Sequence, residues 1–240
     1  MQRHFDNSED ICKYVADRSD TAILAFSCGK DSIAAWIQMR RYFKKIIPFY
    51  WVLVPGLSFI DESLKYYEDF FGSKIERIPS PSLYRMLTNL VFQAPENCSI
   101  VEDMELDVDS KDAIVKRWKR DIGVSDDTFI ALGTRAVDSI MRRRTVKKWG
   151  ALNPNRKSFL PVFDWNKARL KDELRGAGVK LPVDYEMFGR SFDGIDYRFL
   201  KPIKDRFPED YQRILEFFPL AELEIKRREW RERYYEKASR

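Results

Sequence analysis

Short apolar runs alternate along this chain with longer stretches in which apolar residues recur on one helical face. The apolar runs predict buried strands at residues 21–26, 48–54 and 128–132, with a short alternating strand at 74–78. The stretches between them predict helices at residues 32–44, 61–71, 80–90 and 111–121. Strands that alternate with helices in this order predict an α/β fold with an open, mostly parallel, doubly wound sheet.

The pattern is weaker in two other parts of the chain. Residues 93–110 are acidic and predict a solvated loop, and residues 183–204 mix aromatic, glycine and charged residues with little periodicity. Residues 222–237 predict a highly charged helix. We therefore expect an α/β domain over residues 1–180 and a helical, irregular C-terminal extension over 181–240, packed on that domain.

The composition narrows the class of protein. With 240 residues the chain can bury one full core, and its net charge of +5 favours an anionic ligand without requiring nucleic acid. Its three cysteines form no CxxC pair, which predicts no iron–sulfur cluster and a reducing environment. No apolar run is long enough to cross a bilayer, and the N-terminus has no hydrophobic signal region, so we expect a cytoplasmic protein.

The scarcity of histidine excludes several kinds of catalysis. His4 is the only histidine, which removes most Ser/His and Cys/His nucleophilic schemes and the usual zinc sites. Chemistry must then come from Lys, Arg, Asp or Glu side chains, from backbone amides or from a bound cation. Phosphoryl and nucleotidyl transfer rely on such groups, because they work by positioning and charge compensation.

One loop has the layout of a phosphate-binding site. A buried strand is followed directly by a polar loop that contains one glycine and one lysine and then by a helix start, in the order Ser27, Cys28, Gly29, Lys30, Asp31 and Ser32. This layout points backbone N–H groups at an anion. The loop is not a Walker A motif, because position 24 is leucine and Asp31 follows the lysine. A plain turn with Ser27 as a helix cap is the alternative.

A second strand and glycine turn repeat this layout with cationic side chains. The turn and the predicted helix after it supply Gly133, Arg135, Asp138, Ser139, Arg142 and Arg143. Arginine presents a planar fork that suits phosphate oxygens, and the spacing predicts Arg135 and Arg142 on one helical face. For Arg142 and Arg143, a solvated helix end is an equally good interpretation.

Together the two motifs resemble those of a known family. The first resembles S-x-G-K-D-S, the PP-loop of the ATP pyrophosphatase superfamily, with Cys28 where glycine is most frequent. The second is similar to G-x-R-x-x-[DE]-S-x-x-R of the phosphoadenosine-phosphosulfate (PAPS) reductases in that superfamily. Weaker echoes lie at residues 55–63 and 160–165, so the resemblance covers residues 21–165. It implies that both motifs hold an adenine nucleotide, either ATP or PAPS.

The chain departs from the reductases in the segment that carries their reaction. PAPS reductases have a late E-C-G-[IL]-H segment whose cysteine attacks the sulfonucleotide, and this chain has no cysteine after Cys98. We therefore expect cleavage of ATP between the α- and β-phosphates, with Mg²⁺, and adenylylation of an acceptor. Lys30, Asp31 and Arg135 are the predicted catalytic residues. Replacing Lys30 or Arg135 by alanine should abolish turnover and leave the fold intact.

Two alternatives stay open. The chain could be a PAPS or adenosine-phosphosulfate reductase, or a sulfurtransferase, that uses Cys28 or Cys98 as an atypical nucleophile. It could instead be a module of a nucleic-acid modification system that senses a nucleotide without converting it. The charged C-terminal helix carries Trp230 and Tyr234 and would bind a protein partner, or less readily a single-stranded nucleic acid.

Overall fold

The structure is a computed structural model that describes residues 4–105 and 108–238. Contacts between residues divide the chain into two compact units. The first unit comprises Met1–Trp51, Leu64–Ile78 and Val115–Pro182, and the second comprises Val52–Ser63, Pro79–Ile114 and Val183–Arg240. A nucleotide-binding domain over residues 1–180 with an extension over 181–240 stays a prediction. Among the described residues, no helix is both long and apolar enough to span a bilayer.

The first unit contains nearly all of a six-stranded sheet with the order β3-β2-β1-β4-β6-β5. Its strands are β1 Thr21–Ala25, β2 Lys45–Val52, β3 Glu76–Pro79, β4 Ile130–Leu132, β5 Leu152–Asn153 and β6 Ser158–Phe159. Strand β1 is parallel to β2 and to β4, β4 is parallel to β6, and β5 pairs antiparallel with β6. The predicted α/β fold with a mostly parallel, doubly wound sheet is therefore confirmed.

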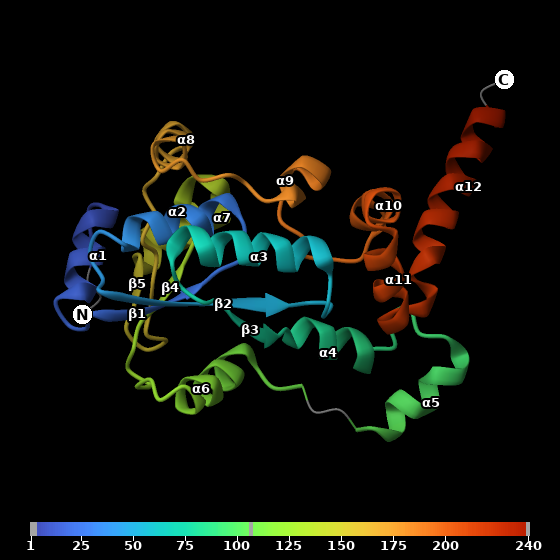
Figure 1. Ribbon diagram of the computed structural model, residues 1–240, viewed down its shortest axis with the longest axis horizontal. Coiled ribbons are helices and arrows are strands. Elements are labelled where there is room, and N and C mark those ends of the chain that lie inside the picture. The colour runs from blue at the N-terminus through green and yellow to red at the C-terminus, as the bar shows by residue number, and fades with distance from the viewer. Residues whose placement is uncertain (1–3, 106–107, 239–240) are drawn as a thin grey trace. The chain divides into compact units, whose positions relative to one another are not determined.

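Helices on both sides of the sheet bury its apolar residues. Figure 1 shows α2 (Lys30–Met39) on one side of β1 and β2, and α6 (Lys111–Asp121) on the other. On the α2 side, Trp36 packs edge-on against Phe26 and stacks on Phe71 with a centroid distance of 4.0 Å. On the α6 side, Phe49 of β2 contacts Trp118. These buried contacts fix where β1 ends and α2 begins, which is where the glycine-lysine loop lies.

Other helices complete the first unit. They are α1 (Ser8–Ala16), α7 (Ile140–Trp149) and α8 (Lys167–Gly176), and α3 (Ser58–Phe71) begins in the second unit and ends in the first. A side chain caps the first turn of α1, α7 and α8, and those caps are Asn7, Ser139 and Asn166. Helix α7 differs from the others because none of its residues is buried.

The second unit is built around aromatic side chains. Its helices are α4 (Pro81–Thr88), α5 (Pro95–Asp103), α9 (Val183–Phe188), α10 (Tyr197–Arg206), α11 (Pro208–Phe217) and α12 (Glu222–Ala238). Phe59 lies within 6.3 Å, centroid to centroid, of Phe188, Phe192 and Phe207. The buried Asp210 carboxylate accepts hydrogen bonds from the backbone N–H groups of Ser58 and Phe59 at the start of α3.

The loop predicted over residues 93–110 is wrong in part. Half of residues 93–110, expected as a loop, forms α5, and residues 106–107 lie outside the described residues. Helix α5 buries no residue, so it has no apolar period, and Pro95 at its first turn is the signal that could have revealed it. Residues 183–204 contain α9 and most of α10, where Pro202 inside the helix obscures the period of the buried Phe199 and Ile203. The charged helix predicted at 222–237 corresponds to α12.

Candidate functional site

The two phosphate-type loops follow neighbouring parallel strands. The first loop, Ser27–Ser32, comes after β1 and leads into α2, and the second loop, Gly133–Ser139, comes after β4. From β1 the strand order runs to β2 and β3 on one side and to β4 on the other, so the crossover direction reverses between β1 and β4. In open α/β sheets, ligands bind outside the carboxyl ends of the strands at this switch point. Both loops lie there.

Hydroxyl groups hold the first loop in shape. The buried Ser32 Oγ donates to the carbonyl of Gly29 at 2.8 Å and accepts from the Ser27 backbone N–H at 3.2 Å. The Ser27 Oγ lies 3.2 Å from the same oxygen. Because the Ser32 hydroxyl at the end of the loop bonds to Ser27 at its start and to Gly29 in its middle, the turn is fixed before any ligand binds. Ser27 itself is exposed, so it is not a purely internal cap.

The backbone of the first loop explains its small residues. Cys28 has a φ of +54°, in the left-handed region that glycine adopts without strain, and its side chain is 1% exposed. Gly29 stands at the cap position of α2, and no described side chain caps that helix. The first N–H groups of a helix need acceptors, and an anion at an uncapped N-terminus supplies them.

The second loop touches the first through the backbone. A Cβ atom added to Gly133 would lie 2.7 Å from both the N and the Cα of Ser32, and 2.8 Å from the carbonyl carbon of Asp31. Atoms that are not bonded do not approach this closely, so a side chain at position 133 would push the two loops apart. The glycine therefore serves a close approach between backbones.

Arg135 joins the two loops by ion pairs. Its guanidinium donates to Asp31 Oδ1 at 2.6 Å, to Asp138 Oδ1 at 2.7 Å and to the backbone carbonyl of Trp165 at 3.3 Å. The residue is 1% exposed. Arginine suits this position because one planar group can donate in several directions at once. The guanidinium thus faces protein acceptors, so its placement favours positioning the loops over direct contact with a ligand.

The ion pairs continue outward on both sides of Arg135. Lys30 Nζ lies 3.6 Å from Asp31 Oδ2, and Arg142 Nη1 lies 3.0 Å from Asp138 Oδ2. The side chains at these two ends are 39% and 50% exposed, whereas both carboxylates are 20% exposed or less. We call the five residues Lys30, Asp31, Arg135, Asp138 and Arg142 the charge ladder. Its three cations and two carboxylates give a net charge of +1, and the cationic side chains at its two ends are accessible to a ligand.

The second loop does not lead straight into a helix, contrary to the sequence prediction. A short 3-10 turn, Ala136–Asp138, comes first, and Ser139 then caps α7 by accepting from the N–H of Arg142 at 3.1 Å. Arg135 lies outside α7, so the prediction that it shares a helical face with Arg142 is wrong. The two arginines meet through Asp138 instead. Arg143 lies on α7, is exposed and is outside the ladder.

Sequence reasoning missed the part played by residue 165. Besides the carbonyl that accepts from Arg135, the buried Trp165 donates its indole N–H to Ser8 Oγ at 2.9 Å. Helix α1 is thereby linked to the back of the charge ladder. The signal in the sequence was the weak resemblance of residues 160–165 to a segment of the PAPS reductases. That resemblance assigned no role to an individual side chain.

The cysteines are placed unfavourably for thiol chemistry at these loops. Burial raises the pKa of the Cys12 thiol, and the carboxylates of Glu9 and Asp164 raise it further. Cys28 is buried under the first loop, and the partly exposed Cys98 lies on α5 in the second unit. Cys28, the cysteine that belongs to one of the two loops, therefore presents no accessible sulfur.

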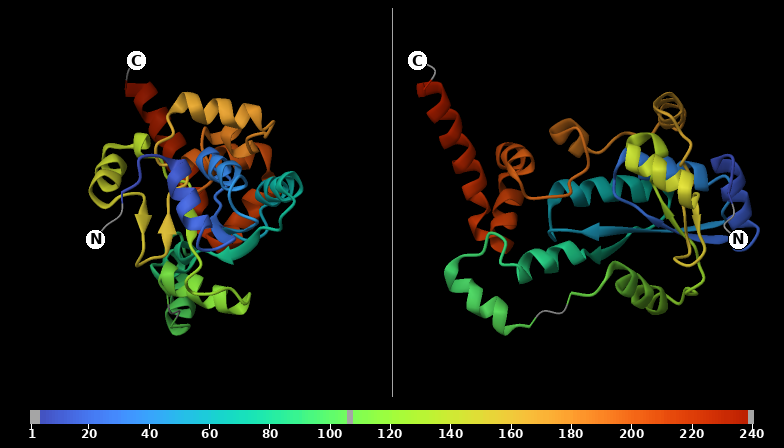
Figure 2. Two further views of the ribbon diagram at one scale, coloured as in Figure 1. Left: turned by 90° about the vertical axis from the view of Figure 1, so that its left-hand side faces the viewer. Right: turned by 180° about the vertical axis from the view of Figure 1, so that it is seen from behind.

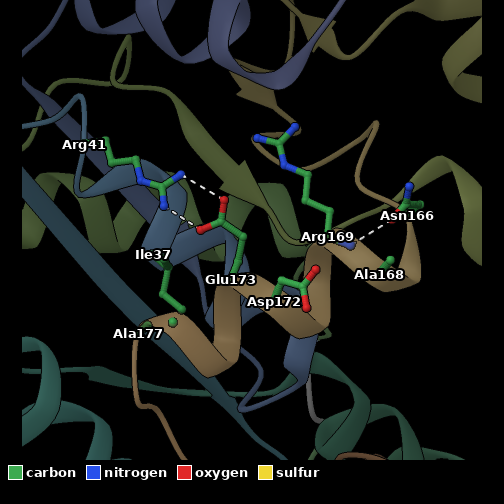
Figure 3. A pocket seen from close by; sticks show the side chains of 9 residues that line it. Ile37, Arg41, Asn166, Ala168, Arg169, Asp172, Glu173 and Ala177 are labelled. Carbon is green, nitrogen blue, oxygen red and sulfur yellow. Dashed lines mark hydrogen bonds and ion pairs between the residues drawn. The ribbon is translucent and has the colours of Figure 1, made fainter.

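A separate pocket lies between α2 and α8, with a volume of about 670 Å³. Figure 3 shows Arg41 and Glu173 facing each other across it as an ion pair, with Nη2 and Oε2 2.5 Å apart. Ile37 and Ala177 line the same pocket, but no residue of either loop does. Because the pocket borders the C-terminal half of α2, it is distinct from the phosphate-type loops.

The donor set of the loops does not fit a magnesium ion held by protein carboxylates. Magnesium prefers oxygen ligands such as carboxylates and water. Each oxygen of Asp31 and Asp138, however, already faces a guanidinium or an ammonium group. Among the described residues, no cluster of histidine, cysteine or acidic side chains could hold a metal ion.

Comparisons with known proteins give distant likenesses in structure. No family model matches this chain, and no curated protein matches it in sequence. A PAPS reductase from Candida auris, in complex with phosphate, is 11% identical, with 78% of this chain and 87% of that chain covered and a TM-score of 0.45. An NH3-dependent NAD synthetase from Campylobacter jejuni is 11% identical, with 92% of each chain covered and a TM-score of 0.45.

A third structure is a predicted subunit of tRNA methyltransferase from Methanocaldococcus jannaschii. It is 17% identical, with 80% of this chain and 92% of that chain covered and a TM-score of 0.34. A PAPS reductase thus stands among the similar structures, as the two sequence motifs indicate. At TM-scores this low, the likenesses carry no argument about function, so the function must be inferred from the loops themselves.

Proposed function

We propose that the chain binds an adenine nucleotide across the first and second loops and cleaves ATP between the α- and β-phosphates. A nucleophilic atom of the acceptor attacks the α-phosphorus, and the bond to the bridging oxygen breaks. Pyrophosphate leaves with the electron pair, and the acceptor loses its proton to water. The products are an adenylylated acceptor and pyrophosphate.

The observation that carries the proposal is the backbone contact between the two loops at the switch point of the sheet. Gly133 allows the second loop to lie directly against Asp31 and Ser32. The uncapped start of α2 then faces the same region as the accessible end of Lys30. Backbone N–H groups, a helix dipole and an ammonium group together suit a leaving diphosphate.

Each part has a separate task in this scheme. The first N–H groups of α2 bind the diphosphate, and Lys30 neutralises the charge that develops on it. Asp31 orients Lys30, and Arg135 holds Asp31 in place as a positioning residue. Mg²⁺ would enter with the phosphates of ATP, because the loop carboxylates are already paired with cations.

The alternative of thiol-dependent sulfonucleotide reduction receives less support. It needs a thiolate that can reach the sulfur of the bound nucleotide. Cys28, the cysteine in the first loop, is 1% exposed. An adenylyl transfer needs no thiol, and the accessible charges of the loops suit it.

The test follows labelled AMP released from ATP labelled on the α-phosphate, and pyrophosphate by a separate enzyme-coupled assay, with water as the acceptor. Lys30→Gln should lower the rate about a hundredfold, because removing one contact to transition-state charge costs about 3 kcal/mol. Lys44→Gln is the matched control, since Lys44 is exposed and pairs with Asp20 outside the loops. Release of ADP and phosphate, or equal rates for both variants, would contradict the proposal.

A further inference from the structure

Helix α7 presents cations without counter-charges on an exposed surface. Its ten residues include Arg142, Arg143, Arg144, Lys147 and Lys148 and no acidic residue. Arg142 belongs to the charge ladder. The other four form no ion pair with any carboxylate in the described part of the chain. Figure 2 shows α7 at the margin of the first unit.

These four cations share one side of the helix. Arg143 and Lys147 are four residues apart, as are Arg144 and Lys148, so each pair lies one above the other on adjacent rows. We call these four residues the α7 cation face. Like charges at this spacing repel each other and destabilise a helix. The arginines of the first turn also oppose the positive end of the helix dipole.

The rest of the fold does little to offset this repulsion. All residues of α7 except Val146 are exposed, and a short helix without a buried face is marginal in water. Ile140 is 71% exposed and Met141 is 67% exposed, both in the first turn. A negatively charged partner along the cation face would remove the repulsion. The chain does not supply such a partner within its described residues.

The chemistry of the face favours one class of partner. A protein interface would be expected to have an apolar centre, and a membrane surface would need an apolar stripe along the helix. The apolar residues of α7, which are Ile140, Met141, Val146 and Trp149, do not form such a stripe at helical spacing. Repeated cations without carboxylates suit the repeated phosphates of a nucleic acid.

We propose that the α7 cation face binds the phosphate backbone of a nucleic acid that carries the acceptor group. This inference rests on the proposed adenylyl transfer for the identity of the acceptor, but the binding itself does not. Asp138 connects Arg142, in the first turn of α7, to Arg135. A strand bound on α7 therefore lies beside the second loop, where the α-phosphate of ATP would be attacked.

The test measures fluorescence anisotropy of labelled oligonucleotides with the full chain, in the absence of ATP and over a range of salt concentrations. One arm uses mixed-sequence single strands and the other a duplex. The double variant Arg144→Gln/Lys148→Gln should bind at least tenfold more weakly. Its slope of log affinity against log salt should be smaller by about 1.4 on single strands, since each phosphate contact contributes about 0.7.

The matched control removes two cations from α12. Arg228 and Arg233 lie 2.8 Å and 3.9 Å from Glu232 and Glu229, and Arg228→Gln/Arg233→Gln changes the net charge by the same amount. This variant should bind the oligonucleotide like the wild type. An equal loss in both double variants would overturn the proposal, because the binding would then follow net charge alone.

Other outcomes also decide the matter. Tighter binding of polyglutamate or of anionic vesicles than of either oligonucleotide, with the same dependence on α7, would assign the face to a different partner. The thermal stability of the α7 variant should change little, because the repulsion removed offsets the lost contacts of Lys148 with the helix C-terminus and the Trp149 ring. The same melting measurement therefore shows whether loss of binding follows from unfolding. ATP cleavage with water as acceptor is measured separately, so its failure leaves the binding result intact.

Discussion

The first and second loops occupy equivalent places at the ends of neighbouring strands but are built differently. Hydroxyl groups and backbone atoms shape the first loop, and the Ser32 hydroxyl takes part in each of their hydrogen bonds. Ion pairs shape the second, and Arg135 is at its centre. The first leads into α2, which is buried along most of its length, and the second leads into the exposed α7.

This difference indicates a division of tasks. A loop fixed by short neutral hydrogen bonds keeps its N–H groups in place and leaves them available to an anion. A loop fixed by a buried guanidinium holds its neighbour in register, while the helix that follows it remains exposed. We therefore expect substitutions in the second loop to affect stability and ligand binding together.

The largest expected effect comes from removing the centre of the charge ladder. Arg135→Met would remove the buried cation between Asp31 and Asp138 and leave the two carboxylates with only the partly exposed Lys30 and Arg142, which costs about 3 kcal/mol. Urea unfolding should show this loss. From the sequence we expected the fold to tolerate replacement of Arg135 by alanine. The buried ion pairs of Arg135 instead predict a loss of stability.

The control for this variant is Arg142→Met, at the half-exposed end of the ladder. An exposed ion pair contributes at most about 1 kcal/mol, so the urea midpoint should move little. Equal destabilisation by both variants would contradict the special position of Arg135.

A smaller effect is expected from separating the loops. Gly133→Ala places a Cβ atom against the backbone of Ser32 and should cost about 1–3 kcal/mol, as overpacking does. The affinity for ATP, measured by calorimetry, should fall as the loops move apart. Gly176→Ala is the control, because nothing lies within 4 Å of a Cβ atom there. Because residue 176 is helical, Gly176→Ala should raise the free energy of unfolding by about 0.5–1 kcal/mol. If Gly133→Ala bound ATP as tightly as the wild type, the second loop would not be part of the ATP-binding site.

The smallest effect is expected at Cys28. Cys28→Gly removes the strain of a left-handed backbone conformation, which is about 1–2 kcal/mol. Against this, glycine loses more conformational entropy on folding, which costs about 0.5–1 kcal/mol. The net change in the free energy of unfolding should be small. Release of AMP and pyrophosphate should continue at the wild-type rate. A variant that folds normally but loses this activity would restore Cys28 as a candidate nucleophile.

Much of the fold could be predicted from the sequence, because strongly periodic segments bury their apolar residues. Strands β1, β2 and β4 and helices α2 and α6 all correspond to predicted elements. Strands β5 and β6 are too short to form a pattern, and their pairing depends on the neighbouring β4. Helices α5 and α7 bury no residue, so hydrophobic periodicity could not define them.

The residues of the candidate site were also found from sequence, but their relations were not. Two separate motifs indicated the loops, and the parallel sheet implied that both end at the same edge. Nothing in the spacing showed that Arg135 would be buried between Asp31 and Asp138. That arrangement depends on residues about a hundred positions apart, and packing of the sheet brings them together.

The sequence by itself determined the α/β class, the succession of the main strands along the chain and the two loops with a phosphate-type layout. Local patterns suffice for these features, because burial of an apolar face and the chemistry of glycine, lysine and arginine act over a few residues. Only the tertiary structure decided that Gly133 admits one loop against the other and that Arg135 faces carboxylates. It also decided that the α7 cation face stands exposed. These features depend on distances and solvent exposure between segments that are remote in sequence, which only the folded chain fixes.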